Sequence, residues 1–132
     1  MGYYFPMPPL PHSIELHDST LAAVVQTPDA QIFCLRPAYI HHQGKGWKQD
    51  ADICLSGSGA IQPPSELPSW IGDGSLTTAR RLHDNLLELP LQEEGPVTLN
   101  LLLTTGEALQ AQGTAVSVVL HGQPRFVEDV PF

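Results

Sequence analysis

Histidine and aspartate stand side by side twice in the sequence, at His17-Asp18 and at His83-Asp84. An imidazole beside a carboxylate can move protons or hold a metal ion, provided that the fold also brings a substrate or nucleophile to them. Adjacency in sequence is not such an arrangement, and Asp is a common turn former, so we interpret both pairs as turns or strand entries. His17-Asp18 is the better functional candidate because it precedes a strong strand, where the fold could bury a polar cluster.

The six histidines also raise the question of a metal site. Two ligands on one strand should be two residues apart so that both side chains leave the same face, whereas His41 and His42 are adjacent. The sequence contains no His-x-His, His-Glu-x-x-His or Cys-x-x-Cys motif. We therefore predict neither a metal ion nor a cofactor, although His17-Asp18 could meet His41 or His83 from separate strands.

Other reactive or aromatic residues give weaker signals. The Ser-Gly-Ser-Gly sequence at 56–59 lacks the Gly-x-Ser-x-Gly spacing of a hydrolase elbow and is interpreted as a turn. Cys34 and Cys54 lie in apolar strands without a flanking cation, so we expect inert core thiols. Trp47 and Trp70 lie beside Gly- or Pro-containing loops, where each could line a ligand surface or equally cap the open end of the core.

The elements that must position these residues are short strands. Proline makes up 13 of 132 residues, about twice the usual share, which excludes most long helices. Residues 21–26 and 31–36 form a predicted hairpin around a turn at 27–30. Residues 39–42 would extend the second strand past Pro37, which must then lie at an edge or bulge.

Further strand signals follow along the middle of the chain. We expect a loop at 43–46, a strand at 50–55, the turn at 56–59 and a short strand at 60–62 that Pro63 and Pro64 end.

Residues 75–89 allow two interpretations. As a helix, they would place Ala79, Leu82, Leu86 and Leu89 on one apolar stripe. As strands, they would turn at 83–85. The preceding Gly-Asp-Gly turn and the local threonines favour strands, because β-branched residues lose rotamer freedom in a helix.

The C-terminal third has the clearest pattern. Val97, Leu99, Leu101 and Leu103 alternate with other residues, as in a strand with one buried face. We predict a turn at 105–106, a returning strand at 107–112, a bend at Gly113, a third strand at 115–120 and a last one at 125–128.

These patterns predict an all-β fold with at most one short helix: an antiparallel β-sandwich or a small β-barrel whose C-terminal half is a meander. Residues 13–132 form one predicted domain, long enough to bury a core. Residues 1–12 form a predicted extended arm that is rich in proline and aromatic residues.

Charge limits the possible partners. The chain has 14 Asp and Glu against six Lys and Arg, a formal charge of -8. Such a chain cannot build the basic surface that nucleic acids or anionic membranes require. Apolar runs such as 21–25 are far shorter than the roughly 20 residues that span a bilayer, and the N-terminus does not have the pattern of a secretory signal. We expect a soluble, cytoplasmic protein with reduced thiols.

Two functional hypotheses follow. The first is a non-enzymatic module that binds a protein partner or copies of itself, with a homodimer as its simplest form. The second is a barrel or small enzyme that binds a small ligand or metal in a pocket formed by His17, Asp18, His41 and His83.

Overall fold

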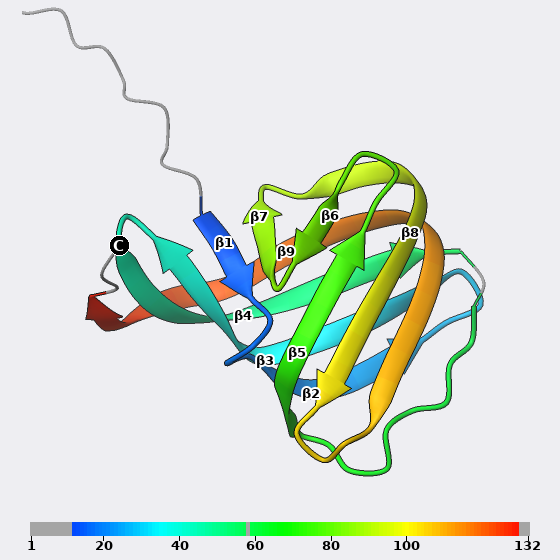
Figure 1. The fold of residues 1–132 in the computed structure, drawn as a ribbon, viewed down its shortest axis with the longest axis horizontal. Coiled ribbons are helices and arrows are strands. Elements are labelled where there is room, and N and C mark those ends of the chain that lie inside the picture. The colour runs from blue at the N-terminus through cyan, green and yellow to red at the C-terminus, as the bar shows by residue number, and fades with distance from the viewer. Residues whose placement is uncertain (1–11, 58, 130–132) are drawn as a thin grey trace, which may run out of the picture.

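The computed structural model describes residues 12–57 and 59–129, and all its regular elements are β-strands (Figure 1). They are β1 (His12–Glu15), β2 (Thr20–Gln26), β3 (Ala30–His42), β4 (Lys45–Ser56), β5 (Ser69–Thr77), β6 (Leu82–Asp84), β7 (Leu86–Leu89), β8 (Gln92–Leu103) and β9 (Ala108–Asp129). The predicted all-β class is confirmed, and 75–89 forms strands rather than a helix. Within the described residues no helix is long and apolar enough to span a membrane.

Six strands close into a ring. They pair in the order β2-β5-β8-β9-β4-β3, and β2 also pairs β3, always antiparallel. The β2–β5 seam is short, with only Thr20↔Trp70 and Leu21↔Ser69 in register. The sequence left a β-sandwich and a small β-barrel open, and this closed strand order is barrel-like.

The interior of the ring is filled by the alternating apolar residues of its strands. Val97, Leu99, Leu101 and Leu103 are each at most 3% exposed, which confirms the predicted buried face of β8. Phe33 on β3 is fully buried among them. One continuous apolar cluster thus holds the ring together.

Three strands continue past the ring into an open sheet, which we call the extension. It comprises β1, β7, residues 38–50 of the β3–β4 hairpin and residues 119–129 of β9, paired in the order β9-β4-β3-β1-β7 (Figure 1, left). Register shifts mark where the strands leave the ring, between Leu35 and Ala38 and between Lys48 and Asp50. Pro37 lies in the first of these irregularities, as expected for a proline within a strand.

Two predicted breaks in β9 are wrong. The bend expected at Gly113 and the separate last strand expected at 125–128 are both parts of the one unbroken strand. A Cβ at Gly113 would lie 2.6 Å from the backbone oxygen of Ser56, so this glycine lets β9 approach β4 closely instead of bending. Pro124 is tolerated because it lies in the register irregularity between Arg125 and His121, in a part of β9 that has a strand on one side only.

Smaller corrections concern the predicted loops. Residues 60–62 form no strand, because the backbone of Ile61 bonds to the side-chain amide of Gln26 instead of to another strand. The loop expected at 43–46 is reduced to a turn at Gln43 and Gly44, both with positive φ. The turn expected at 83–85 is confined to Asn85, with φ 66°, so His83 lies within β6. Residues 1–11, the bulk of the predicted arm, lie outside the described residues, and His12 is the first residue of β1.

Candidate functional site

Three of the predicted site residues meet around one carboxylate that the sequence analysis did not single out. His41 Nε2 lies 2.7 Å from Glu15 Oε2, and His17 Nδ1 lies 4.0 Å from Glu15 Oε1 and 3.4 Å from Asp18 Oδ1. Asn85 joins them by accepting a hydrogen bond from the His17 backbone N–H at 2.8 Å. We call these five residues the Glu15 cluster.

Local backbone geometry explains how the Glu15 cluster assembles. His17-Asp18 forms the turn between β1 and β2, closed by a Ser19 N–H to Leu16 O hydrogen bond, and Asp18 has the left-handed φ of 80° that Asp tolerates better than most residues. Glu15 and His41 reach the same face because β1 and β3 pair side by side. The two-residue spacing of Glu15 and His17 is the sequence signal that could have identified the carboxylate.

The Glu15 cluster contains atoms that suit a cation. Ligand atoms of Glu15, His17 and Asp18 lie within 4.8 Å of one another, the one such group of three or more His, Cys, Asp or Glu in residues 12–57 and 59–129. The side chains of His17 and Asp18 are half exposed, and Glu15 Oε2 is already engaged by His41. These contacts make the cluster a network that joins β1, β3 and the β6–β7 turn.

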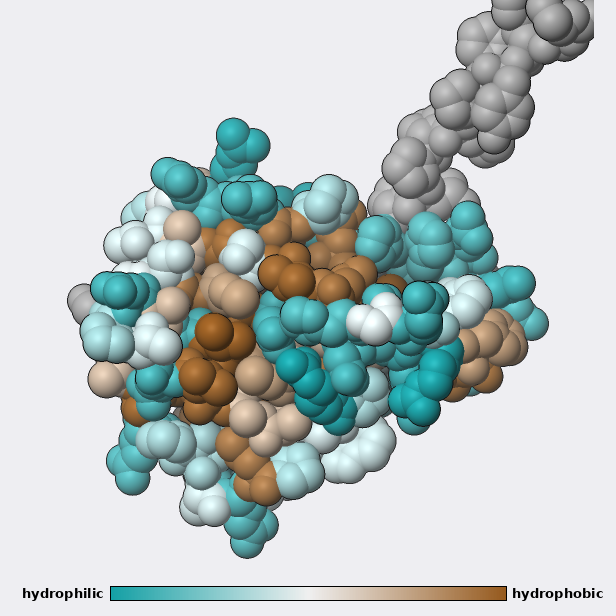
Figure 2. All heavy atoms as spheres, turned by 180° about the vertical axis from the view of Figure 1, so that it is seen from behind, coloured by the Kyte–Doolittle hydropathy of each residue, from teal (hydrophilic) through white to brown (hydrophobic). Residues whose placement is uncertain are grey.

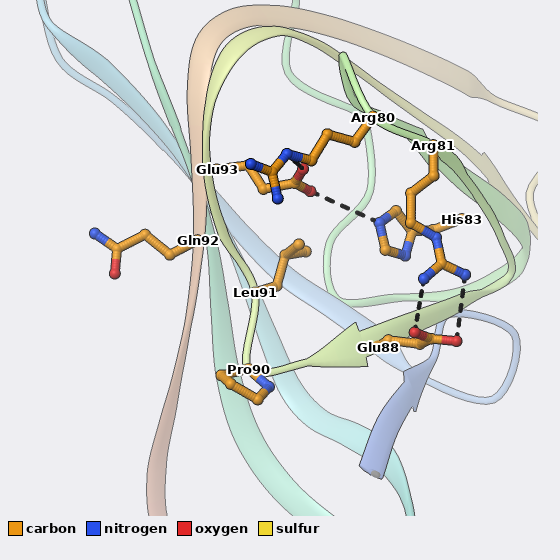
Figure 3. A pocket seen from close by; sticks show the side chains of 8 residues that line it. All are labelled: Arg80, Arg81, His83, Glu88, Pro90, Leu91, Gln92 and Glu93. Atoms are coloured by element: carbon orange, nitrogen blue, oxygen red, sulfur yellow. Dashed lines mark hydrogen bonds and ion pairs between the residues drawn. The ribbon is translucent and has the colours of Figure 1, made fainter.

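His83 lies outside the Glu15 cluster. Its side chain is 2% exposed and faces Glu93, with Nε2 3.9 Å from Glu93 Oε2, across a separate cavity of about 270 Å³ (Figure 3). Burial is the largest cause that lowers the pKa of His83 below its ordinary value, and the positive charge of Arg81 lowers this pKa further. The imidazole is therefore kept neutral, and the structure does not unite it with His17, Asp18 and His41 in one pocket.

The two tryptophans have different surroundings. Trp47 packs against the core, its ring meets Phe126 edge to face at 5.6 Å, and its Nε1 donates to His42 O at 3.3 Å. Trp70 on β5 is 56% exposed. Trp47 is thus a partial cap of the core, whereas Trp70 presents its ring to solvent.

A further polar group lies on the outer face of β3, β4 and β9. Asp52 forms a hydrogen bond with His121 Nε2 at 2.7 Å and an ion pair with Arg36 Nη2 at 3.0 Å. Burial would raise the pKa of Asp52, but the bonds from His121 and Arg36 outweigh it and hold that pKa below its usual value. The sequence analysis missed this group because its members are far apart in the chain.

Both cysteines lie half-buried beside Asp52, on the face of β3 and β4 that points away from Phe33 and Ile53, so their expected place in the core is wrong. Burial, followed by the charge of Asp52, raises the pKa of Cys34 and of Cys54. A raised pKa leaves less of the reactive thiolate, which favours the expected inertness.

Comparisons with known proteins add nothing to this geometry. No protein family, curated protein or solved structure matches the chain. The surfaces of the molecule are therefore what points to a function.

Proposed function

We propose that the protein is a non-enzymatic, self-associating module in which a second copy pairs with the open edge of β9. One observation carries this proposal: residues 121–129 of β9 are all exposed. In the described structure, β9 pairs with β8 only as far as Ser117, the Val118 N–H still bonds Leu91 O, and beyond it β4 is the strand partner as far as Asp129. Residues 122–124 lie in a register irregularity, and Pro124 has no N–H, so the edge that can accept a further strand is that of residues 125–129.

Apolar side chains flank this edge. Phe126 is 54% exposed, and Val119 and Val127 are 45% and 39% exposed. On the face seen in Figure 2, apolar side chains gather in groups over the middle of the molecule, with polar side chains between and around them. This distribution favours association through backbone pairing reinforced by a few apolar contacts, rather than through one broad apolar patch.

The order of charges along the edge favours a second copy as the partner. Arg125 precedes Glu128 and Asp129. An antiparallel pair centred on Val127 would place each Arg125 opposite Asp129 of the other copy, whereas Glu128 points to the other face, where it accepts a hydrogen bond from Tyr39 Oη at 2.7 Å. Opposite charges across paired strands stabilise the pair, and like charges destabilise it. Twofold symmetry would use this contact twice.

Charge reversal tests the pairing. Arg125→Asp or Asp129→Arg alone should each weaken self-association about tenfold, because two symmetric attractive contacts become repulsive. The double variant should recover most of the loss. The measurement is the molar mass by light scattering across a concentration series.

Arg80→Asp is the matched control, since it changes the net charge equally at an exposed residue away from β9. A wild-type mass that stays monomeric at every concentration would refute the proposal. So would an equal response of Arg125→Asp and Arg80→Asp.

Residues 1–11 provide a second test of self-association. They lead into His12, whose ring meets that of His42 at 5.0 Å, next to Trp47. If these residues dock on a neighbouring copy, deleting them should lower both the oligomer mass and the melting temperature. Unchanged values in both measurements would show that they take no part in the interface.

The free thiols support a proposal about the cellular compartment of the protein. Cys34 and Cys54 are unpaired in the structure, and free thiols are typical of reducing compartments. We therefore place the module in the cytoplasm. A non-reducing gel of protein from cells should show no disulfide-linked species.

A further inference from the structure

The cavity beside His83 is lined by a buried imidazole that is short of hydrogen-bond partners. Within the described structure, neither ring nitrogen of His83 makes a hydrogen bond of good geometry, and only the backbone of Leu86 acts weakly on the ring. A buried polar group left unpaired costs about 1–3 kcal/mol, so native proteins nearly always satisfy it with protein, water or a ligand. His83 lines the cavity, which makes a molecule held there the natural partner (Figure 3).

Glu93 on the other side of the cavity is similarly short of partners. Its side chain is 17% exposed, and its contacts are long: Thr78 Oγ1 at 3.4 Å, His83 Nε2 at 3.9 Å and Arg80 Nε at 3.9 Å. An ionised carboxylate can accept about four hydrogen bonds. The Glu93 carboxylate therefore has capacity for a strong donor.

The two arginines of the cavity differ in their availability. Arg81 is held by Glu88 through two bonds of 2.7 and 3.3 Å, drawn as paired dashed lines in Figure 3. Arg80 is 85% exposed and has only the long contact to Glu93. The cavity thus has an inner negative group, Glu93, and a free positive group, Arg80, close to it.

A cationic amine fits the inner end better than a metal ion does. A nitrogen placed about 2.9 Å from both Glu93 Oε2 and His83 Nε2 would see them at an angle of roughly 90°, which an ammonium group can satisfy with two N–H bonds. A zinc ion usually takes four ligands. Here only these two atoms are free, because Glu88 is engaged by Arg81.

We propose that this cavity binds a small zwitterion of the α-amino acid class, with its ammonium group between Glu93 and His83 and its carboxylate against Arg80. Guanidinium groups bind carboxylates in a bidentate manner. The ammonium and carboxylate of an α-amino acid are separated by one carbon, in keeping with the 3.9 Å between Glu93 and Arg80. A volume of about 270 Å³ suits a molecule of this size and lies below the range of drug-sized ligand pockets.

Calorimetric titration of the full chain with glycine, L-alanine and L-leucine tests the site. Leu91 and Pro90 line the cavity, so a larger apolar side chain should improve binding. We expect saturable binding of at least one of the three, with a Kd of about 1 mM. L-Leucinamide lacks the carboxylate and should bind about tenfold more weakly, and 4-methylpentanoate lacks the ammonium group and should not bind.

Variants assign each contact. Glu93→Gln should weaken amino acid binding at least about tenfold. Arg80→Ala should weaken L-leucine binding to the same extent while leaving L-leucinamide unchanged, and its exposed position makes misfolding an inadequate explanation. Arg125→Ala is the control for loss of an arginine. It should not affect amino acid binding, even if it alters self-association.

A second readout reports directly on His83. The ¹⁵N resonance of its Nε2 should shift on amino acid binding, because that nitrogen gains a hydrogen bond. Absence of saturable binding by all three amino acids would overturn the proposal and leave water as the occupant. Equal binding of 4-methylpentanoate and L-leucine, or an unshifted His83 resonance at saturation, would also overturn it.

Discussion

The two ends of β9 show one strand in two environments. Near its start, β9 pairs with β8 alone as far as Gly113 and with both β8 and β4 at 115–117, and Leu109, Ala111 and Val116 are at most 8% exposed. Residues 121–129 have β4 on one edge only and are exposed throughout. Successive side chains of any strand point to opposite faces of the sheet. They alternate between buried and exposed only where another layer covers one of these faces. The start of β9 thus builds the core, and its end is available for contacts.

Removing one large side chain from each end of β9 should give the largest difference in the free energy of unfolding. Leu109→Ala should lower the free energy of unfolding by about 2–5 kcal/mol, because it leaves a cavity in the ring. Phe126→Ala should lower it by less than about 1 kcal/mol, because that ring is 54% exposed. Urea unfolding at low protein concentration measures both. Equal losses would mean that the end of β9 is as much a part of the core as its start.

A glycine in the first half of β9 provides the next largest effect. Gly113→Ala places a Cβ 2.6 Å from the backbone oxygen of Ser56, so strands β4 and β9 must separate, at a cost of about 1–3 kcal/mol. The neighbouring exposed Gln112→Ala should stay within about 0.5 kcal/mol of wild type. Urea unfolding compares the two variants. A neutral Gly113→Ala would show that the packing between β4 and β9 is looser than the structure indicates.

Acidification should have a smaller effect, and it should act in opposite directions on the stability of the fold and on self-association. Burial and Arg81 outweigh Glu93 and Glu88 and lower the pKa of folded His83, so below about pH 6.5 the unfolded chain binds the extra proton more readily. The stability due to neutral His83 is complete above that pH and is lost as the pH falls below it. Association should instead strengthen, because acidification makes the net charge of -8 less negative and so weakens the repulsion between copies.

Unfolding free energies and light scattering at about pH 7.5 and 5.5 separate these two effects. His83→Gln should reduce the loss of stability at the lower pH. A constant mass at both pH values would exclude the effect on association, and parallel losses in wild type and His83→Gln would exclude the effect assigned to His83.

The same contrast explains which parts of the fold the sequence could predict. The strand at Val97 to Leu103 was assigned correctly because a strand with one covered face has an apolar residue at every second position of its sequence. Pro124 was misinterpreted because proline usually interrupts strands, whereas here it lies in a register irregularity of an edge segment that the sequence does not reveal. Gly113 was misinterpreted because glycine is favoured both where a strand bends and where two backbones approach closely, and the sequence does not distinguish the two.

The candidate sites depended even more on tertiary structure. The meeting of His17, Asp18 and His41 was anticipated as a possibility, but Glu15 at their centre was not. His83 was assigned to a turn, whereas a one-residue turn at Asn85 leaves it in β6 with a buried side chain. Its facing partner, Glu93, comes from β8, and sequence alone gives no register between these strands.

The continuity of three strands has a mechanical consequence. β3, β4 and β9 each run from the ring into the extension without a connecting linker. The extension therefore has no hinge on which to swing, and force applied at Asp129 is transmitted along the hydrogen-bonded β4–β9 ladder into the barrel. A copy bound at that end would resist unfolding of the whole chain, so the melting temperature should rise with protein concentration.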